Sequence, residues 1–308
     1  MTISESILTQ IGERKVQLTN LDKIYWPKDG YAKSDLVRYY SEMAHYILPH
    51  LKDRPLSLVR YPSGIHEAGF YQKDAPQGMP DWVRIAPVYS KEKESYTNFI
   101  LCDNLETLVW MANSGVIEIN PWLSTYERPD QPDFAVFDID PSQGATWDDV
   151  RIVAKMVRSL LDELGLQGFP KVSGATGVHI YVPIEAKYSY KQVSEFVGWG
   201  ASLIRDAYPQ KVTLERKIKD RTGKVYIDYP QNARGQTITS VYGVRASDGA
   251  PVSMPINWEE LDDPQVNPQA WNIKNALARV SQKGDIFAPV LALRQSLDRL
   301  WRGASPRY

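Results

Sequence analysis

Two aspartates lie two residues apart at the end of an apolar segment rich in strand-forming residues. Residues 133–144 read DFAVFDIDPSQG, so Asp138 and Asp140 follow the apolar run and precede Pro141. Side chains alternate between the two faces of a β-strand, so both carboxylates would point to the same side. Like charges at the end of a buried strand are costly unless a cation lies between them. We therefore expect a divalent metal site, most naturally for Mg²⁺ or Mn²⁺, which bind oxygen ligands and leave positions for phosphates.

A third aspartate has the same local setting. Asp228 ends the alternating segment KVYID and is followed closely by Pro230. Acidic residues at the ends of two strands are what a two-metal phosphoryl-transfer site requires. An aspartate that caps a turn would give the same pattern. The spacing alone therefore leaves both roles open for Asp228.

A glycine-containing hairpin lies between these two acidic segments. It reads SGATGVH, in which Gly174 and Gly177 would let backbone amides approach an anion, and Ser173 and Thr176 supply hydroxyl groups. His179 could donate a hydrogen bond to a phosphate, although a purely structural histidine fits a strand equally well. The hairpin is thus a candidate cradle for a triphosphate. The basic residues that could complete its charge neutralisation are Arg221, Lys224 and Arg245.

Composition limits the classes of protein to which the chain can belong. Its 308 residues contain 36 Lys and Arg against 37 Asp and Glu, so any nucleic-acid surface must be local. The single cysteine, Cys102, cannot form an intramolecular disulfide, and four histidines offer no zinc-ligand spacing. The N-terminus lacks a secretion signal, and no apolar run is long enough to span a membrane. We expect a cytoplasmic protein with no membrane partner.

The elements that must position these residues alternate irregularly along the chain. Hairpins are evident and no glycine-rich phosphate loop follows a first strand, which disfavours a doubly wound dinucleotide fold. We predict an α+β fold with a mostly antiparallel or mixed sheet, and one domain over residues 1–308 because no linker forces a boundary. Strands are expected at 55–62, 96–102, 115–119, 133–140, 169–184 as a hairpin, 211–214, 224–229 and 237–244.

Helices are predicted from apolar residues at helical spacing and from their capping residues. One begins at Ser34 as N-cap and is stopped by Pro49. Capping boxes open two others, Thr146 with Asp149 and Ser189 with Gln192. The remaining expected helices are 105–113, 258–261, 268–280 and 289–301.

Several segments, in this order, resemble one known family. FDIDP, SGATGVHIYVP and KVYIDYPQNARGQTITSVYGVR are similar to the polymerase domain of bacterial and archaeal ligase D, the end-joining branch of the archaeo-eukaryotic primase superfamily. LTNLDKIYWPKDGYAKSDLVRYY and RYPSGIHEAGFYQKDAP also look like that family. The resemblance covers about residues 12–285 and leaves 286–308 as a C-terminal helix.

The resemblance implies a fold and an activity. The fold would be primase-like, with an RRM-like catalytic sheet and an N-terminal α/β portion packed against it. The activity would be template-directed, gap-filling nucleotidyl transfer at DNA double-strand breaks, with ribonucleotides preferred over deoxynucleotides. The 3′-hydroxyl would attack the α-phosphate of the NTP between two Mn²⁺ or Mg²⁺ ions. DNA with 5′-phosphorylated ends or gaps, Ku and a DNA ligase would be the partners, and the protein would be nucleoid-associated.

The resemblance also assigns roles to individual residues. Asp138, Asp140 and Asp228 would be catalytic metal ligands. Gln231 and Asn232 lie beside Asp228, where a contact to the ribose 2′-hydroxyl and a turn role fit equally well. For nucleotide binding the resemblance implies Ser173 and His179 at the triphosphate with Arg245 in support, and position in the sequence adds Thr176, Arg221 and Gln231 as candidates. The residues implied in contacts to the DNA 5′-phosphate or template are Lys23, Phe70 and Tyr71, with Lys15 and Lys33 as looser candidates.

Two positions depart from the family pattern, and two other functions stay open. Thr176 replaces a lysine that is common in the glycine turn, and Asn120 replaces a histidine that many relatives carry beside the active site. A DNA-end-binding module without turnover is one alternative. An aspartyl-nucleophile phosphatase is another, because Asp138, Asp140 and Ser142 mimic its motif. The sequence also leaves open whether the chain is a stand-alone polymerase or one domain of a larger ligase.

Overall fold

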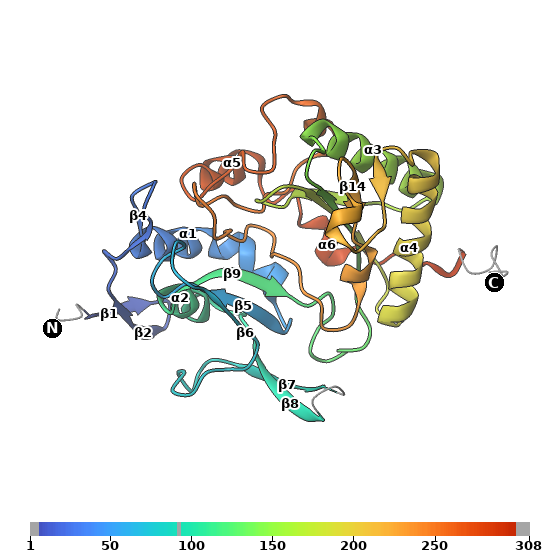
Figure 1. Ribbon diagram of the computed structural model, residues 1–308. Coiled ribbons are helices and arrows are strands. Elements are labelled where there is room, and N and C mark those ends of the chain that lie inside the picture. Colours follow the sequence, from blue (N-terminus) through green and yellow to red (C-terminus); the bar gives the residue numbers. More distant parts are fainter. Residues whose placement is uncertain (1–5, 91–93, 300–308) are drawn as a thin grey trace.

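The computed structural model describes residues 6–90 and 94–299 and has the predicted α+β architecture (Figure 1). Two sheets of five strands each lie in different parts of the chain, and each is accompanied by its own helices. We call residues 6–121 the N-terminal half and residues 133–299 the C-terminal half. Among the described residues, no helix is both long and apolar enough to cross a bilayer.

The N-terminal half is a mixed layer of antiparallel strands and two helices. The central strand is β5 (Leu56–Arg60), which pairs with β9 (Val116–Pro121) and with β6 (Phe70–Gln72). Strands β7 (Ile85–Ser90) and β8 (Ser95–Ile100) form a hairpin that projects from the body at the bottom of Figure 1. The remaining elements are β1 (Ser6–Ile11), β2 (Arg14–Thr19), β3 (Ile24–Trp26), β4 (Tyr31–Ala32), α1 (Lys33–Leu51) and α2 (Leu105–Asn113).

The C-terminal half is built on a sheet with the strand order β11-β12-β10-β14-β13. Its centre is β10 (Phe134–Pro141), which pairs antiparallel with β12 (Val178–Pro183) and β14 (Val225–Ile227). The edges are β11 (Phe169–Val172), antiparallel to β12, and β13 (Val212–Thr213), parallel to β14. The predicted acidic strand is therefore the middle of the sheet.

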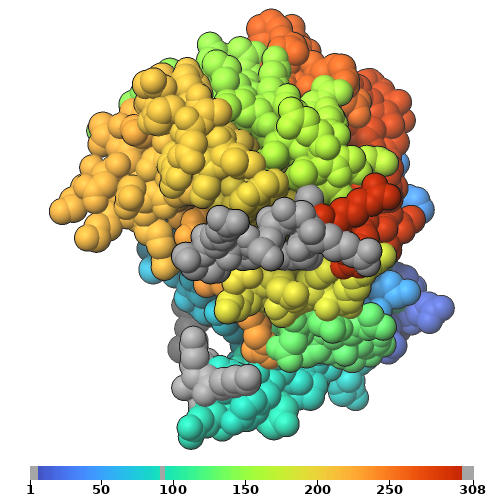
Figure 2. Space-filling model, turned by 90° about the vertical axis from the view of Figure 1, so that its right-hand side faces the viewer, coloured from blue at the N-terminus to red at the C-terminus, as the bar shows by residue number. Residues whose placement is uncertain are grey.

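Two amphipathic helices cover one face of this sheet. They are α3 (Trp147–Glu163) and α4 (Tyr190–Ala207), and both predicted capping boxes are present at their N-termini. The ring of Phe137 on β10 packs edge-to-face against Phe196 of α4, which marks this face as the apolar one. Figure 2 views the molecule from the side of α4, with the β7–β8 hairpin in teal at the bottom. The other face of the sheet points toward the N-terminal half.

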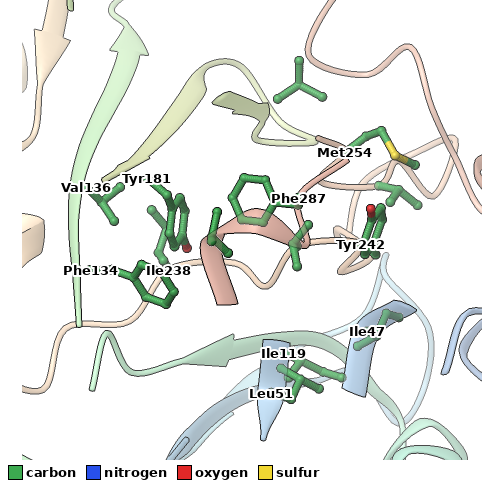
Figure 3. Packing of buried hydrophobic residues seen from close by; sticks show 14 of the residues in the cluster. Ile47, Leu51, Ile119, Phe134, Val136, Tyr181, Ile238, Tyr242, Met254 and Phe287 are labelled. Carbon is green, nitrogen blue, oxygen red and sulfur yellow. The ribbon is translucent and has the colours of Figure 1, made fainter. Parts of the chain in front are cut away.

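One hydrophobic core joins the two halves. Ile47 and Leu51 of α1 and Ile119 of β9 belong to the same buried cluster as Tyr181 and Phe287 of the C-terminal half (Figure 3). A buried ion pair crosses the same boundary: the guanidinium of Arg54 donates to both carboxylate oxygens of Asp133, at 2.8 and 2.7 Å. The halves are thereby held at a fixed separation, and any site between them has two rigid walls.

The start and the end of α1 differ from the prediction. The N-cap is Ala32 rather than Ser34, because the carboxylate of Asp35 accepts a hydrogen bond from the Ala32 amide at 2.8 Å. Pro49 does not stop the helix, which continues to Leu51. Near a helix end a proline removes only one hydrogen bond, so α1 tolerates it.

The chain after residue 228 is more irregular than predicted. Residues 237–244 form no strand, because Tyr242 has a positive φ of 60° and the segment makes only isolated bridges at Thr237 and Val244. The expected helix 268–280 begins only at Ala276, since Asn272 bridges to Pro251. The expected helix 289–301 is a single turn, because Gln295 bridges to Ile184, and its residues after 299 lie outside the described part. The short helical elements here are η1 (Ile218–Asp220), η2 (Tyr229–Asn232), η3 (Trp258–Asp262), α5 (Ala276–Lys283) and α6 (Pro289–Ala292).

Candidate active site

Four polar residues form a row across the uncovered face of the C-terminal sheet. The register pairs Lys171 of β11 with His179 of β12, and His179 with Asp138 of β10. The amide of Asp228 donates to the Asp138 carbonyl at 2.8 Å, which places Asp228 opposite Asp138 on the other side. Directly paired residues of adjacent strands point to the same face, so all four side chains share it. The structure thus brings together three of the predicted residues and adds a lysine.

Asp140 lies on the same face, one pleat further along β10. It pairs in register with Tyr226, whose hydroxyl donates to Asp228 Oδ1 at 3.1 Å. Thr176 Oγ1 lies 3.5 Å from Asp140 Oδ1. The guanidinium of Arg221 stacks on the Tyr226 ring, 3.5 Å from its centroid. The three aspartates therefore occupy one patch, with Arg221 at its border.

The three carboxylates repel one another. Burial raises the pKa of Asp138 well above its ordinary value, and the charges of Asp140 and Asp228 raise it further. Burial and the charge of Asp228 also raise the pKa of Asp140. Asp138 Oδ1 is buried and makes no hydrogen bond, with His179 Nε2 at 3.4 Å. The charges of Lys171 and Arg245 act in the opposite direction on Asp138 but do not offset burial and this repulsion.

This donor set fits a hard divalent cation. Three carboxylates at strand ends, one with an unpartnered buried oxygen, are the ligand chemistry that Mg²⁺ and Mn²⁺ use. Within residues 6–90 and 94–299, however, no three acidic, histidine or cysteine side chains already converge on one metal position. Asp228 has the Tyr226 hydroxyl as its partner instead. The patch therefore supplies suitable ligand atoms, but its side chains do not yet converge on one metal position.

A large polar cleft lies between the two halves, above this patch. Its volume is about 750 Å³, and its walls come from both sheets and from the loop after η2. The C-terminal half contributes Asp138, Asp140, Ser173, Thr176, His179 and Arg245, and the N-terminal half contributes Ser57, Tyr71, Lys73, Glu118 and Asn120. The cleft is large enough for a nucleotide, and most of the predicted site residues line it.

The glycine turn is tightly organised by its serine. Ser173 Oγ accepts hydrogen bonds from the amides of Ala175, Thr176 and Gly177 at 3.0–3.1 Å. Gly177 packs against β10, where a β-carbon would collide with the Ile139 carbonyl oxygen. Gly174 has a φ of +73°, and a β-carbon there would lie 2.7 Å from Arg245 Cγ. The three amides are therefore used within the turn, which Ser173 holds in a fixed shape against the carboxylate patch.

Arg245 faces the cleft and is held from both halves. Its guanidinium lies 3.4 Å from Glu118 Oε2 of β9 and also donates to Thr239 Oγ1. Its Nε is buried and without a hydrogen-bond partner. Arg245 is thus an oriented cation with one unused donor, and Glu118 is a partner that the sequence did not indicate.

Asn120, at the position where the family resemblance implies a histidine, lies in the floor of the cleft. Its side-chain oxygen accepts from Thr239 Oγ1 at 3.2 Å, while its Nδ2 is buried without a partner. The opposite residue on β5, Ser57, also has an unpartnered buried hydroxyl. Asn120 and Ser57 therefore leave polar atoms without hydrogen-bond partners in the floor of the cleft.

Lys171 is the site residue that sequence reasoning missed. It is completely buried, and burial and the charge of Arg245 hold its pKa well below the ordinary value, against the opposing effect of Asp138. Its position opposite His179 in the hairpin was the available signal, since the pairing of β11 with β12 follows from the turn. A lysine inside an apolar strand is expected at the surface unless it has a specific role.

Aromatic side chains form the rim of the cleft. Phe70 and Tyr71 of β6 are 47% and 74% exposed, and Tyr71 and Lys73 line the opening. The Arg60 guanidinium stacks on Phe70, 5.3 Å from the ring centroid. Exposed aromatic faces beside a cation are typical of surfaces on which bases stack.

The three candidate lysines of the N-terminal half are not equivalent. Lys23 is exposed, and its ammonium donates to the Pro62 carbonyl at 2.7 Å. Lys15 is exposed on β2. Lys33 is buried and donates to the Thr19 carbonyl at 2.6 Å, and burial together with the charge of Lys23 lowers its pKa to about 8. Lys33 is therefore not presented to solvent as a phosphate contact would be.

Gln231 and Asn232, the two residues beside Asp228, have different surroundings. Asn232 is fully buried, and its amide exchanges two hydrogen bonds of 2.8 Å with the backbone of Val136. It therefore fixes η2 to β10, and a contact to ribose is wrong for this residue. Gln231 lines the cleft and donates to the Thr237 carbonyl at 2.7 Å.

Comparison with known proteins gives consistent similarities in sequence. Residues 32–287 match the family described as "LigD, primase-polymerase domain". The chain is 32% identical over 274 residues to the bifunctional non-homologous end joining protein LigD of Bacillus subtilis, covering 89% of this chain and 44% of that protein. It is 31% identical over 288 residues to the multifunctional LigD of Mycolicibacterium smegmatis, covering 93% and 37%. The chain thus spans less than half the length of these relatives.

A solved structure has the same fold. It is described as the polymerase domain from Mycobacterium tuberculosis ligase D in complex with DNA. The match has a TM-score of 0.85 at 29% identity and covers 92% of this chain and all of that one. The similarity therefore includes both halves and the cleft between them.

Proposed function

The chain belongs to the LigD primase-polymerase family of DNA-directed nucleotidyltransferases, and from this premise we propose that it adds template-directed nucleotides to 3′ ends at DNA breaks and gaps. The observation that carries the proposal is the row of Asp138, His179 and Asp228 with Asp140 on one face of a sheet, beneath a polar cleft. The family membership sets aside the phosphatase alternative, whose motif also leaves Asp228 and the glycine turn without a role.

The carboxylates would hold two Mg²⁺ or Mn²⁺ ions. Asp138 and Asp228 would hold the ion that activates the primer hydroxyl, and Asp140 would also serve the ion that accompanies the nucleotide. When bound, such ions activate a hydroxyl nucleophile and neutralise a leaving pyrophosphate. The protein's own part is to keep three hard oxygen donors on one rigid face, where burial strengthens each electrostatic contact.

The nucleotide would lie in the cleft with its phosphates on the C-terminal half. The Nε2 of His179 would supply a neutral donor to phosphate oxygens, and the turn ordered by Ser173 would bring the Thr176 hydroxyl beside them. Arg245 supplies an oriented charge, and Arg221 lies at the other border of the carboxylate patch. Gln231 is the candidate for a contact to the ribose 2′-hydroxyl and hence for a preference for ribonucleotides.

The DNA would be bound by the N-terminal half. Phe70 and Tyr71 offer exposed rings to template bases at the opening of the cleft. Lys23, with Lys15 as the second exposed lysine, would bind a 5′-phosphate. Ku and a DNA ligase, separate or joined to the chain, would be the partners in repair, and this work would place the protein at the nucleoid.

The deciding experiment is incorporation of labelled NTP on a gapped duplex with a 5′-phosphate, in the presence of Mn²⁺. We expect extension by one or a few nucleotides that depends on the template base and is greater with UTP than with dTTP. The double variant Asp138→Ala, Asp140→Ala should bind DNA but not extend it. Undiminished extension by this variant would exclude the metal assignment.

A binding experiment separates catalysis from end recognition. Binding to a 5′-phosphorylated end should be tighter than to a 5′-hydroxyl end and should weaken steeply with salt, because phosphate contacts release counterions. Lys23→Ala should remove the preference. Equal affinity of the wild-type protein for both ends would reject the phosphate pocket and leave the catalytic proposal intact.

A further inference from the structure

We propose that Lys171 is a positioning residue that fixes His179 in the tautomer with its hydrogen on Nε2, the ring nitrogen that faces Asp138. The consequence for nucleotide binding rests on the function proposed above. The tautomer is a property of the protein without substrate, so the tautomer assignment and the proposed function can fail independently of each other. Lys171 does not line the cleft, and any effect on a bound nucleotide must pass through His179.

The surroundings of Lys171 are unusual for a lysine. Its side chain has no exposed surface, and its ammonium lies 2.8 Å from His179 Nδ1, 2.9 Å from the Thr239 carbonyl and 2.5 Å from Ser253 Oγ. None of these hydrogen-bond partners is a carboxylate. A buried ammonium without a paired anion is a net cost to stability. Packing alone would favour an apolar residue at this place in β11.

The hydrogen-bond inventory fixes two of the three Nζ hydrogens. The Thr239 carbonyl oxygen can only accept, so it takes one hydrogen from Lys171. Ser253 uses its own hydroxyl hydrogen on the Val172 carbonyl, at 2.9 Å, so its oxygen also accepts from Lys171. We take Lys171 to be an ammonium, which then has one hydrogen left for its remaining partner, His179 Nδ1. Nδ1 is therefore the acceptor, and the ring hydrogen lies on Nε2.

The position of Asp138 supports the same assignment. His179 Nε2 lies 3.4 Å from Asp138 Oδ1, an oxygen with no other hydrogen-bond partner. With the hydrogen on Nε2, this nitrogen faces the oxygen as a donor. With the hydrogen on Nδ1, the Nε2 lone pair would face a lone pair of the ionised Asp138 carboxylate across this distance. In the assigned tautomer His179 can donate to a carboxylate, or to a phosphate oxygen that enters the cleft.

Thr239 connects this arrangement to the rest of the site. Its carbonyl accepts from Lys171, while its hydroxyl accepts from Arg245 and donates to Asn120. The lysine is thus anchored by the same residue that orients the cation of the cleft. A fixed lysine holds the imidazole ring in one orientation, which spares the histidine an ordering cost when a nucleotide binds.

The first test reads the tautomer directly in the substrate-free protein. Long-range proton–nitrogen NMR spectra of protein with ¹⁵N-labelled histidine distinguish the two neutral tautomers. The chain has four histidines, and a His179→Gln variant identifies the resonance. We expect the pattern of an Nε2–H ring. A neutral Lys171 amine would instead accept from Nδ1–H, and that pattern would overturn the proposal whatever the enzymatic activity.

The second test removes the lysine. Lys171→Met keeps the length and apolar stem of the side chain but cannot hold Nδ1. We expect the His179 spectrum to change and KM for the NTP to rise roughly ten- to hundredfold, the range for one hydrogen bond to a charged group, with a smaller change in kcat. An unchanged KM and an unchanged spectrum in the folded variant would both contradict the positioning role.

Ser253→Ala is the matched control, because it removes one partner of Lys171 and leaves the contact to His179. We expect its Nε2–H pattern to persist and its KM to change by roughly threefold at most. A KM rise equal to that of Lys171→Met would assign the effect to general loosening of this buried region and refute the role of His179. If Lys171→Met does not fold, the wild-type spectrum decides the tautomer.

Discussion

The two faces of β10 have opposite polarity. Phe137 and Ile139 are completely buried on the face that packs against α4 and α3, whereas Asp138 and Asp140 alternate with them in the chain and face the cleft. The same strand thus presents a hydrophobic layer on one side and mutually repelling carboxylates on the other. The apolar face stabilises the fold, and the carboxylate face reduces its stability.

This difference explains why the carboxylate face is tolerated. The rigid core on one side holds the strand in place, so the charges on the other side cannot relax apart. Strain of this kind is expected where a site is kept ready for a ligand of opposite charge. The comparison predicts that changes on the two faces separate activity from stability, and each experiment below tests that separation.

The largest effect is expected for Asp138→Asn. The variant keeps the shape of the side chain but removes a metal-binding charge, so extension of a gapped duplex should fall on the order of a thousandfold, which corresponds to several kcal/mol of transition-state stabilisation. Its metal-free stability should equal or exceed that of the wild-type protein, because one repulsive charge is gone. Steady-state incorporation assays and urea unfolding measure the two quantities. A variant that is inactive because it is unfolded would contradict the separation.

The opposite face should give the opposite result. Phe137→Ala removes a buried ring from the contact with Phe196, and we expect a loss of about 3–5 kcal/mol in the free energy of unfolding. The carboxylates stay on β10, so the activity per folded molecule at low temperature should stay within a few-fold of wild type. Denaturant unfolding gives the first number, and activity normalised to the folded fraction gives the second.

Metal should stabilise only a protein with an intact carboxylate face. At a Mn²⁺ concentration about 100 times the dissociation constant, binding to the native state alone adds about 2.7 kcal/mol to the free energy of unfolding. Thermal melts of wild type and Phe137→Ala should both shift upward with Mn²⁺, and melts of Asp138→Asn should shift little. Equal shifts in all three would mean that the ion binds elsewhere.

The metal-free protein should lose stability as the pH rises through the weakly acidic range. The pKa values of Asp138 and Asp140 are higher in the native state than in the unfolded chain. Between the unfolded pKa and the native pKa, the native state therefore binds more protons than the unfolded state. The contribution is fully present below the unfolded value of about 4 and disappears as the pH passes the native values. To isolate this contribution, the free energy of unfolding of wild type and of Asp140→Asn is measured as a function of pH, and the difference between the two is plotted. Parallel curves would refute the repulsion.

The sequence allowed the prediction of elements whose signals are local. The capping residues Thr146 and Ser189 and the alternation around Asp138 and Asp228 placed both helices and both acidic strands correctly, because caps and pleats depend on neighbouring residues. The irregular segment 237–244 was mistaken for a strand, since its apolar residues pack between the halves without a continuous strand partner.

The site was predictable in its acidic residues and less so in their partners. Asp138, Asp140 and Asp228 follow from spacing and family pattern, whereas Lys171 and Glu118 contribute through contacts between distant segments. Lys33 was predicted as a phosphate contact but is buried, because the first residue of α1 reaches Thr19 at the end of β2, and this tertiary contact cannot be read from a basic, aromatic stretch. Partners across a cleft depend on tertiary structure, which a periodic pattern does not contain.

The smallest effect concerns the turn at the border of the carboxylate face, where Thr176 stands in place of the lysine common in the family. Thr176 is exposed and lies next to Asp140, so Thr176→Lys would place an ammonium beside both the carboxylates and the phosphates of a bound nucleotide. An exposed ion pair contributes about 0.2–1 kcal/mol, so KM for the NTP should fall by roughly fivefold at most. The gain should shrink with added salt, which screens exposed charges. Ser159→Lys, which adds the same charge on the exposed side of α3, should leave KM unchanged. A gain that persists at high salt, or one shared by Ser159→Lys, would mean that the added charge acts on the whole protein rather than at this turn.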